Sequence, residues 1–239
     1  FLRLSGSAVL ARSRWISPGL GGVWTGEDWR LDPREALEAL VAAGEAAGVR
    51  RISGSVEGFE RGRAVLSDGE TVTADHLVIA TGASESLAAL APELRHLTPV
   101  KGHILSMPGV AAPGPVVRYR AGYICPTARG VLIGSTMERG RRDRAVDPKI
   151  ARKLLDAAAK VSSHVANGPL VARTGVRAAT PDGLPLVGRS ETDGVWLAVG
   201  TRRNGWLLAP LIADLLGQAL AGGEPDRRAP LFAPGRFAR

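Results

Sequence analysis

The apolar positions of the chain repeat at helical spacing in three segments, residues 32–48, 147–161 and 204–222. In the first segment Asp32 can cap a helix that begins at Pro33, because an aspartate accepts main-chain N–H groups and a proline tolerates the first helical position. Glycines close the first and third segments. Each pattern predicts an amphipathic helix with one face on a core.

Short runs rich in β-branched residues, bounded by glycine, proline or an Asp-Gly turn, predict strands. They are residues 49–59, 64–67, 76–80, 103–107, 116–126 with a break near Gly122, 131–135, 170–177 and 195–199. The runs between 103 and 135 are typical of an antiparallel sheet, and the opening stretch and the tail show no such pattern. The predicted fold class is therefore α+β (mixed).

Composition supports a folded core rather than a fibre or a membrane protein. Of the 239 residues, 45% are hydrophobic, while 30 glycines and 16 prolines favour strands and turns over a helical bundle. The chain shows no apolar run that would suggest a membrane span and no signal-peptide pattern. Cys125 has no second cysteine to pair with, which is typical of a reducing cytoplasm, and we expect it to fill space in a strand.

The net charge of +8 and the isoelectric point near 10.6 raise the question of a nucleic-acid partner. The arginines are spread along the chain, and the densest run, Arg139–Arg144, contains an acid just before a helix start. We therefore interpret that run as a solvated loop and expect no nucleic-acid partner.

The sequence contains no complete phosphate-binding motif and no pattern typical of a metal site. Gly19–Trp24 places tryptophan where a dinucleotide fingerprint needs its third glycine, and Gly200–Leu207 lacks the lysine and hydroxyl residue of a P-loop. The four histidines are widely separated, without a ligand-spaced acid beside them, so no metal site is expected.

Three polar residues remain as candidates for chemistry. Arg177 ends a strand, where its guanidinium could pair with a carboxylate, although a surface ion pair is the better explanation of the residue taken alone. Arg203 precedes the last helix, whose first N–H groups favour an anion, although Asn204 could simply cap that helix. Tyr123 lies in a strand, where packing alone would explain it.

Taken in order, several blocks of the chain resemble the D-amino-acid oxidase superfamily of FAD-dependent oxidoreductases, and within it glycine oxidase. The blocks are Val100-Lys101-Gly102, Gly122-Tyr123-Ile124-Cys125-Pro126, Gly134-Ser135-Thr136-Met137-Glu138, Gly175-Val176-Arg177, Asp182-Gly183-Leu184-Pro185-Leu186-Val187-Gly188, Gly200 and Arg203-Asn204-Gly205-Trp206-Leu207-Leu208-Ala209-Pro210. The resemblance extends from about Val23 to Gly222.

The resemblance implies a set of site residues. Arg177 would clamp the substrate carboxylate, Tyr123 would donate its hydroxyl to the same group, and Arg203 would lie near the substrate. FAD would be held by Val56, by Ala80, Thr81 and Gly82, and by Thr201, Arg202, Arg203, Asn204, Gly205, Trp206 and Leu207. The last helix would point its positive end at the flavin.

The implied activity is oxidative deamination of glycine, sarcosine or a small D-amino acid, giving an imine and hydrogen peroxide, with a role in thiamine biosynthesis. Substrate positioning would be the main task of the protein, because a neutral amine passes hydride to the flavin without a strong base. Oxidase and dehydrogenase relatives share these motifs. A homo-oligomer is left open.

The resemblance also implies a domain plan. Residues 23–97 and 170–222 would be the remainder of a Rossmann-like FAD-binding domain, and 98–169 a substrate domain with a large antiparallel sheet. Residues 1–22 would be an irregular lead-in and 223–239 an extended tail. The strand, glycine-rich turn and helix that open such enzymes are missing from this chain, so we expect a carboxy-terminal fragment. We do not expect this chain alone to bind FAD tightly or to be active, because the missing part would supply main-chain donors to the phosphates. A flavin-free binding module and a polyanion-binding protein are the alternatives.

Overall fold

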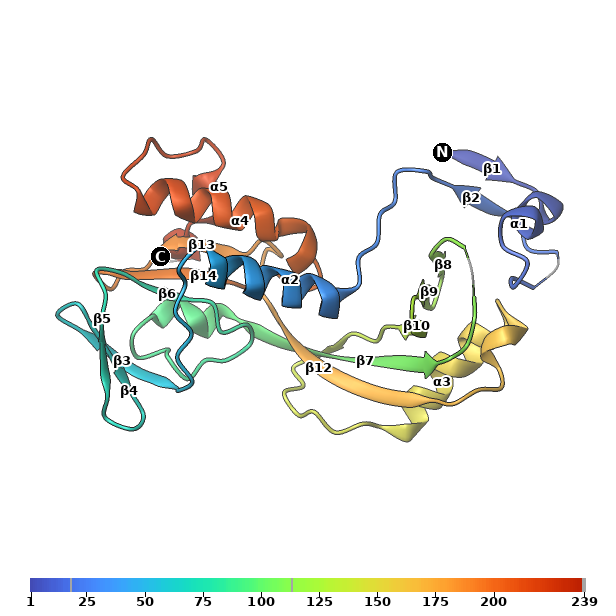
Figure 1. The fold of residues 1–239 in the computed structure, drawn as a ribbon, viewed down its shortest axis with the longest axis horizontal. Coiled ribbons are helices and arrows are strands. Elements are labelled where there is room, and N and C mark those ends of the chain that lie inside the picture. Colours follow the sequence, from blue (N-terminus) through green and yellow to red (C-terminus); the bar gives the residue numbers. More distant parts are fainter. Residues whose placement is uncertain (18, 113, 238–239) are drawn as a thin grey trace. The chain divides into compact units, whose positions relative to one another are not determined.

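The structure is a computed structural model that describes residues 1–17, 19–112 and 114–237 (Figure 1). It confirms the mixed fold class, since helices accompany a large antiparallel sheet. The described chain divides into two compact units. Unit 1 comprises Phe1–Arg51, Gly102–Met137 and Arg144–Gly175, and unit 2 comprises Ile52–Lys101, Glu138–Asp143 and Val176–Arg239.

The helices and strands follow one another along both units. The strands are β1 Leu2–Leu4, β2 Gly22–Trp24, β3 Val56–Glu60, β4 Arg63–Leu66, β5 Thr71–Thr73, β6 Leu77–Ile79, β7 Thr98–Pro108, β8 Val117–Tyr119, β9 Gly122–Thr127, β10 Gly130–Gly134, β11 Glu138–Arg139, β12 Val171–Ala179, β13 Leu186–Arg189 and β14 Val195–Val199. The α-helices are α1 Gly6–Arg12, α2 Pro33–Ala46, α3 Pro148–Ala159, α4 Gly205–Leu220 and α5 Ala229–Phe232. Short 3-10 helices are η1 Pro92–His96, η2 Ser163–Val165 and η3 Pro234–Phe237.

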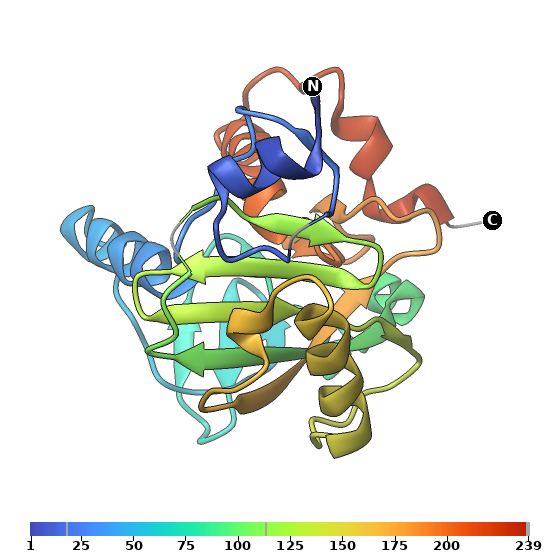
Figure 2. The ribbon, with the colours of Figure 1, turned by 90° about the vertical axis from the view of Figure 1, so that its right-hand side faces the viewer.

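Unit 1 is built on antiparallel pairing of β7 with β10, β10 with β9 and β9 with β8. Alternate residues of these strands, among them Leu105, Ile124 and Ile133, are fully buried. They form one core with Leu154 and Ala158 of α3, which crosses one face of the strands (Figure 2). The apolar stripe of this helix therefore closes the core that the sheet begins.

Local sequence explains how the predicted helices start. Asp32 accepts the N–H groups of Arg34 at 2.9 Å and Glu35 at 3.4 Å, and Asp147 accepts the N–H of Lys149 at 2.8 Å. These caps satisfy first-turn donors that a helix leaves without partners. The helices predicted at 32–48, 147–161 and 204–222 are confirmed as α2, α3 and α4. The expected core contact of the first is not found, because α2 buries no residue and its Leu37 and Leu40 are 55% and 61% exposed.

Unit 2 holds two small sheets. In one, β14 lies between β13, to which it is antiparallel, and β6, to which it is parallel. The other is the antiparallel meander β3–β4–β5. Leu215 and Leu216 of α4 pack with Val187 of β13 and Phe232 of α5, so the last helix lies on the sheet through a core of its own.

The two ends of the chain differ from expectation. Residues 1–22, expected to be irregular, contain β1 and α1, because Leu2–Leu4 pairs with Gly22–Trp24. The tail, expected to be extended, contains α5 and η3 up to residue 237, and the buried Phe232 ties it to the core of α4. Both features depend on contacts distant in sequence, which local periodicity does not reveal.

The division into units also differs from the domain plan, since residues 23–51 lie in unit 1 rather than with the rest of the expected FAD-binding part. The basic run Arg139–Arg144 is exposed at every residue, as expected of a solvated segment, but it also makes ion pairs. Its Asp143 pairs with Lys101, which is 1% exposed, and Arg142 pairs with Glu85. Ion pairs to a buried lysine and to a neighbouring turn hold this run on unit 2.

Candidate active site

The parallel pair in unit 2 brings two loops to one edge of a sheet. Leu77 lies opposite Val195 and Ile79 opposite Leu197, so β6 and β14 run side by side and end together. The chain leaves β6 through residues 80–82 and leaves β14 through residues 200–204. The carboxyl edge of parallel strands is where open α/β sheets bind ligands.

The first loop leaves space at its turn. Ala80, Thr81 and Gly82 are all exposed, and the Thr81 carbonyl accepts the Ser84 N–H at 3.3 Å. Gly82 has a φ of +66°, and a Cβ built on it would meet nothing within 4 Å. The glycine thus permits a left-handed turn with open space beside its backbone.

The second loop, residues 200–204, is closely packed against its neighbours. Gly200 has a φ of +83°, and a Cβ there would lie 2.9 Å from Cγ2 of Thr180. Arg202 has a φ of +52°, uncommon for a residue with a side chain, and its Nε is buried without a hydrogen-bond partner among the described residues. The Asn204 N–H donates to the Thr201 carbonyl at 2.9 Å and turns the chain into α4.

The amino end of α4 follows directly after this loop and presents both main-chain N–H groups and apolar side chains. Asn204 occupies the N-cap position but makes no side-chain capping hydrogen bond in the described structure. Trp206 and Leu207, in the first turn, are 42% and 78% exposed. First-turn N–H groups beside apolar side chains suit a flat aromatic ring that carries an oxygen at its edge.

Strand β12 brings Arg177 to the second loop. The carbonyl of Ala178, the next residue, accepts the Arg202 N–H at 2.8 Å, and Ala179 forms an antiparallel bridge with Thr201. The Arg177 side chain is half-buried and has further interactions. Arg177, Arg203 and the start of α4 are therefore connected through the main chain of a single small region, although far apart in sequence.

Two predicted residues belong to other sheets of the structure. Val56 is the half-buried first residue of β3, in the meander of unit 2, where it lies opposite Leu66. Tyr123 belongs to β9 of unit 1, opposite Gly134 of β10. A Cβ on Gly134 would lie 2.9 Å from Cε1 of Tyr123, so the glycine makes room for this tyrosine ring.

The support of the second loop comes from residues that the sequence pattern did not single out. Thr180 contacts the Gly200 backbone, and its turn is bound by Arg236, 54 residues from Asp182. The Thr-Pro-Asp-Gly turn was visible in the sequence, but a single arginine near the chain end carries no local signal of its partner.

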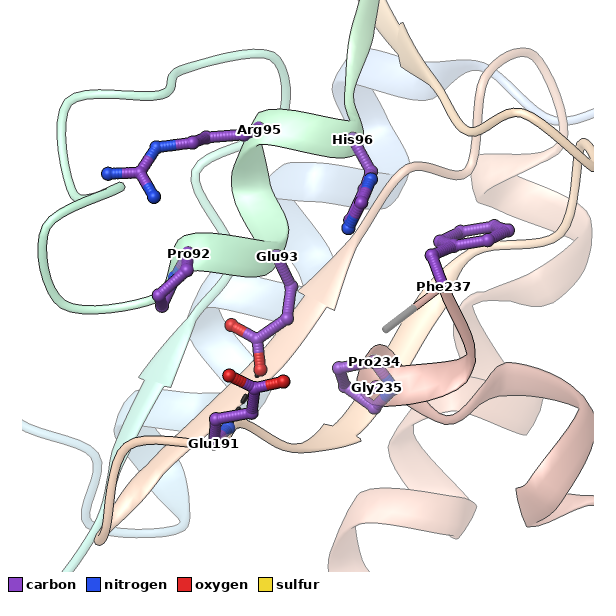
Figure 3. Close-up of a pocket in the computed structure, with 8 residues that line it drawn as sticks. All are labelled: Pro92, Glu93, Arg95, His96, Glu191, Pro234, Gly235 and Phe237. Carbon is purple, nitrogen blue, oxygen red and sulfur yellow. Dashed lines mark hydrogen bonds between the residues drawn. The ribbon is translucent and has the colours of Figure 1, made fainter. Parts of the chain in front are cut away.

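A surface pocket of about 290 Å³ lies between η1 and η3 in unit 2 (Figure 3). Its buried Glu93 accepts the Ser190 hydroxyl at 2.8 Å and the Glu191 N–H at 2.7 Å, so that carboxylate is already bound within the protein. The residues that line this pocket include none of the predicted site residues. We therefore place the candidate site at the β6–β14 edge.

A comparison with protein families matches residues 2–219 to the family of FAD dependent oxidoreductases. The chain belongs to this family. Its sequence is 32% identical over 93% of the chain to the bifunctional protein ThiO/ThiG of Nostoc sp., of which it spans 36%. It is 33% identical over 68% of the chain to the glycine oxidase of Pseudomonas aeruginosa, of which it spans 46%.

Solved structures show the same family fold. The glycine oxidase of Geobacillus kaustophilus, 27% identical, superposes with a TM-score of 0.80 over 100% of this chain and 67% of its own. The iminodiacetate oxidase of Chelativorans sp. BNC1, 24% identical, gives a TM-score of 0.86 over 98% of this chain and 66% of its own. The chain thus spans about a third of the bifunctional relative and two thirds of the solved oxidases.

FAD is the cofactor of this family, and the residues of the β6–β14 edge fit part of it. The left-handed loop, the uncapped N–H groups of α4 and the exposed Trp206 combine polar main-chain donors with an apolar surface. Within the described residues no cluster of His, Cys, Asp or Glu could hold a metal ion. No described helix is long and apolar enough to cross a membrane.

Proposed function

We propose that the chain is part of an FAD-dependent enzyme that oxidises the amine of a small amino acid, glycine, sarcosine or a small D-amino acid. The observation that carries this proposal is the hydrogen bond from Arg202 to Ala178. It ties the strand of Arg177, a group that recognises carboxylates, to the loop that leads into the uncapped end of α4.

Each residue then has a task. Arg177 binds the substrate carboxylate through its planar guanidinium, and Tyr123 donates its hydroxyl to the same group. Arg203 lies beside the substrate. Because these residues fix the amino acid by its carboxylate, they leave the amine and the α-carbon free to face the reactive ring.

The second loop and the first loop hold the cofactor in this proposal. Thr201 to Leu207 bind the ring system, Ala80 to Gly82 line the groove, and Val56 meets the adenine. Bound FAD supplies the acceptor for the hydride of the substrate α-carbon. The helix N–H groups favour negative charge at the ring edge, and the apolar side chains exclude water.

The products would be an imine, which hydrolyses to a 2-oxo acid, and hydrogen peroxide when oxygen is the acceptor. A role in thiamine biosynthesis is part of the proposal, and its motivation is the resemblance to ThiO-type relatives. Cytoplasmic location belongs to the same proposal.

A protein of the length of the solved oxidases that contains this chain, purified with and without added FAD, tests the proposal. We expect a flavin absorbance band that persists after gel filtration, and peroxide release on addition of glycine or sarcosine. A colourless protein that ignores FAD would favour the flavin-free binding module. Bleaching of the flavin by the amino acid without peroxide would identify a dehydrogenase instead of an oxidase.

A further inference from the structure

The side chain of Arg236, in η3, makes five hydrogen bonds to described residues. Nε and Nη2 donate to the two carboxylate oxygens of Asp182 at 2.8 and 3.0 Å, and Nη2 donates to the Leu184 carbonyl at 2.7 Å. Nη1 donates to the carbonyls of Phe232 at 3.1 Å and Ala233 at 3.0 Å. A guanidinium has five N–H donors, so Arg236 is fully engaged, and it is only 13% exposed.

The segment that carries Arg236 is itself anchored. The Phe237 ring lies 5.1 Å from the His96 ring of η1, centroid to centroid, at an interplanar angle of 54°, and both rings line the pocket (Figure 3). Pro234 is buried. The main chain that carries Arg236 is therefore packed against the rest of unit 2.

The partner of Arg236 is a turn with internal order. The Asp182 carboxylate also accepts the Leu184 N–H at 3.0 Å, and the Thr180 hydroxyl donates to the Leu184 carbonyl at 2.6 Å. The Leu184 carbonyl oxygen thus accepts hydrogen bonds from both Arg236 and Thr180. Removing Arg236 would leave the turn with its internal hydrogen bonds but without its tie to η3.

The turn touches the candidate site directly. Thr180 packs on Gly200, where even one added carbon would come within 2.9 Å of its Cγ2. Ala178 and Ala179, the residues before Thr180, hold Arg202 and Thr201 by a hydrogen bond and a bridge. Arg236 is therefore connected to the left-handed loop before α4 through its hydrogen bonds to the Thr180–Leu184 turn and through the contacts of that turn with residues 200–202.

We propose that Arg236 is a positioning residue, which holds the Thr180–Leu184 turn against the Gly200–Arg202 loop and so sets the main-chain position at the start of α4. The assignment of this loop to the cofactor rests on the proposed function. The mechanical link from Arg236 to the loop does not, and it is measured without FAD.

Hydrogen–deuterium exchange of the Arg202 amide tests the link, because this N–H donates to Ala178. In Arg236→Lys, which keeps the charge but loses the planar fork, we expect the Arg202 amide to exchange about tenfold faster or more. Asp182→Asn should have the same effect. Amides of β14, in the core of the same unit, should keep their rates in both variants.

Arg228→Lys is the matched control, because Arg228 also lies near the chain end and pairs with an aspartate, Asp226, away from the turn. It should leave the Arg202 amide unchanged. An unchanged Arg202 amide in either test variant would overturn the proposal. An equal rise in the β14 amides, or failure of both variants to fold, would also overturn it, because the role would then be general stability. FAD binding is assayed separately, so its loss would bear only on the proposed function.

Discussion

The main-chain N–H of Arg202 donates to the carbonyl oxygen of Ala178 at 2.8 Å, which places the strand of Arg177 beside the loop before α4. Residues 24 positions apart are joined by one hydrogen bond. Because both partners are main-chain atoms, no side-chain motif in the sequence predicts this contact. The proposed site depends on this junction.

In a protein of the length of the solved oxidases, Arg177→Ala should raise the KM for glycine or sarcosine by about 100-fold, because a charge-assisted pair with the carboxylate is lost. The KM for a simple amine without a carboxylate should change little. Steady-state kinetics on both substrate types measures the difference. Arg173→Ala, an exposed arginine on the same strand, is the control, and equal effects of Arg177→Ala on both substrates would remove the clamp assignment.

Tyr123→Phe should raise the KM for the same amino acids by about fivefold, because one neutral hydrogen bond to the carboxylate is lost. Gly134→Ala should reproduce much of this effect, since its Cβ would lie 2.9 Å from Cε1 of the ring and displace it. Gly217→Ala, on α4 with open space around it, should leave the KM as it is. Normal kinetics of Tyr123→Phe would show that the hydroxyl takes no part.

Gly200→Ala should destabilise the protein by about 1–3 kcal/mol, because the residue needs a φ of +83° and meets Thr180. The same change at Gly217, in the interior of α4, should stabilise by about 0.5–1 kcal/mol. Urea unfolding compares the two variants. If both shifts had the same sign, the close approach of Thr180 to Gly200 would be in doubt.

Asp143→Asn should lower the urea midpoint, because the buried ammonium of Lys101 loses its carboxylate partner. The double variant Asp143→Asn, Lys101→Met should recover much of the loss by removing the charge that was left unpaired. Asp156→Asn, which breaks an exposed pair with Arg152, should change stability by less than about 0.5 kcal/mol. A double variant no better than Asp143→Asn would contradict this account.

The Arg236 guanidinium lowers the pKa of Asp182 to about 2, below the value of about 3.9 in an unfolded chain. A lowered carboxyl pKa contributes stability that is fully present above about pH 4 and is lost as the pH falls through about 2. Wild type should therefore be more stable than Asp182→Asn at pH 6, and the difference should disappear near pH 2. Unfolding at a series of pH values checks this, and a constant difference would exclude the ion pair as its source.

The sequence predicted the elements whose signals are local. Asp32 and Asp147 mark helix starts because a cap acts within three residues, and residues 195–199 form β14 as expected because a buried strand is a continuous apolar run. Strand β13 was missed, since Leu186–Arg189 is short and contains a glycine. The pairing of β1 with β2 was missed because it joins residues about 20 positions apart.

The sequence by itself determined the family, the helices and the choice of candidate residues. Motifs and helix caps depend on residues that are close together in the chain, so they can be recognised without the structure. Only the tertiary structure decided that the strand of Arg177 adjoins the loop before α4, that Lys101 is buried against Asp143, and that Arg236 binds the Thr180–Leu184 turn. These relationships depend on which distant segments share a core. The free energy of that choice is spread over many burial contacts and is not encoded at any one residue.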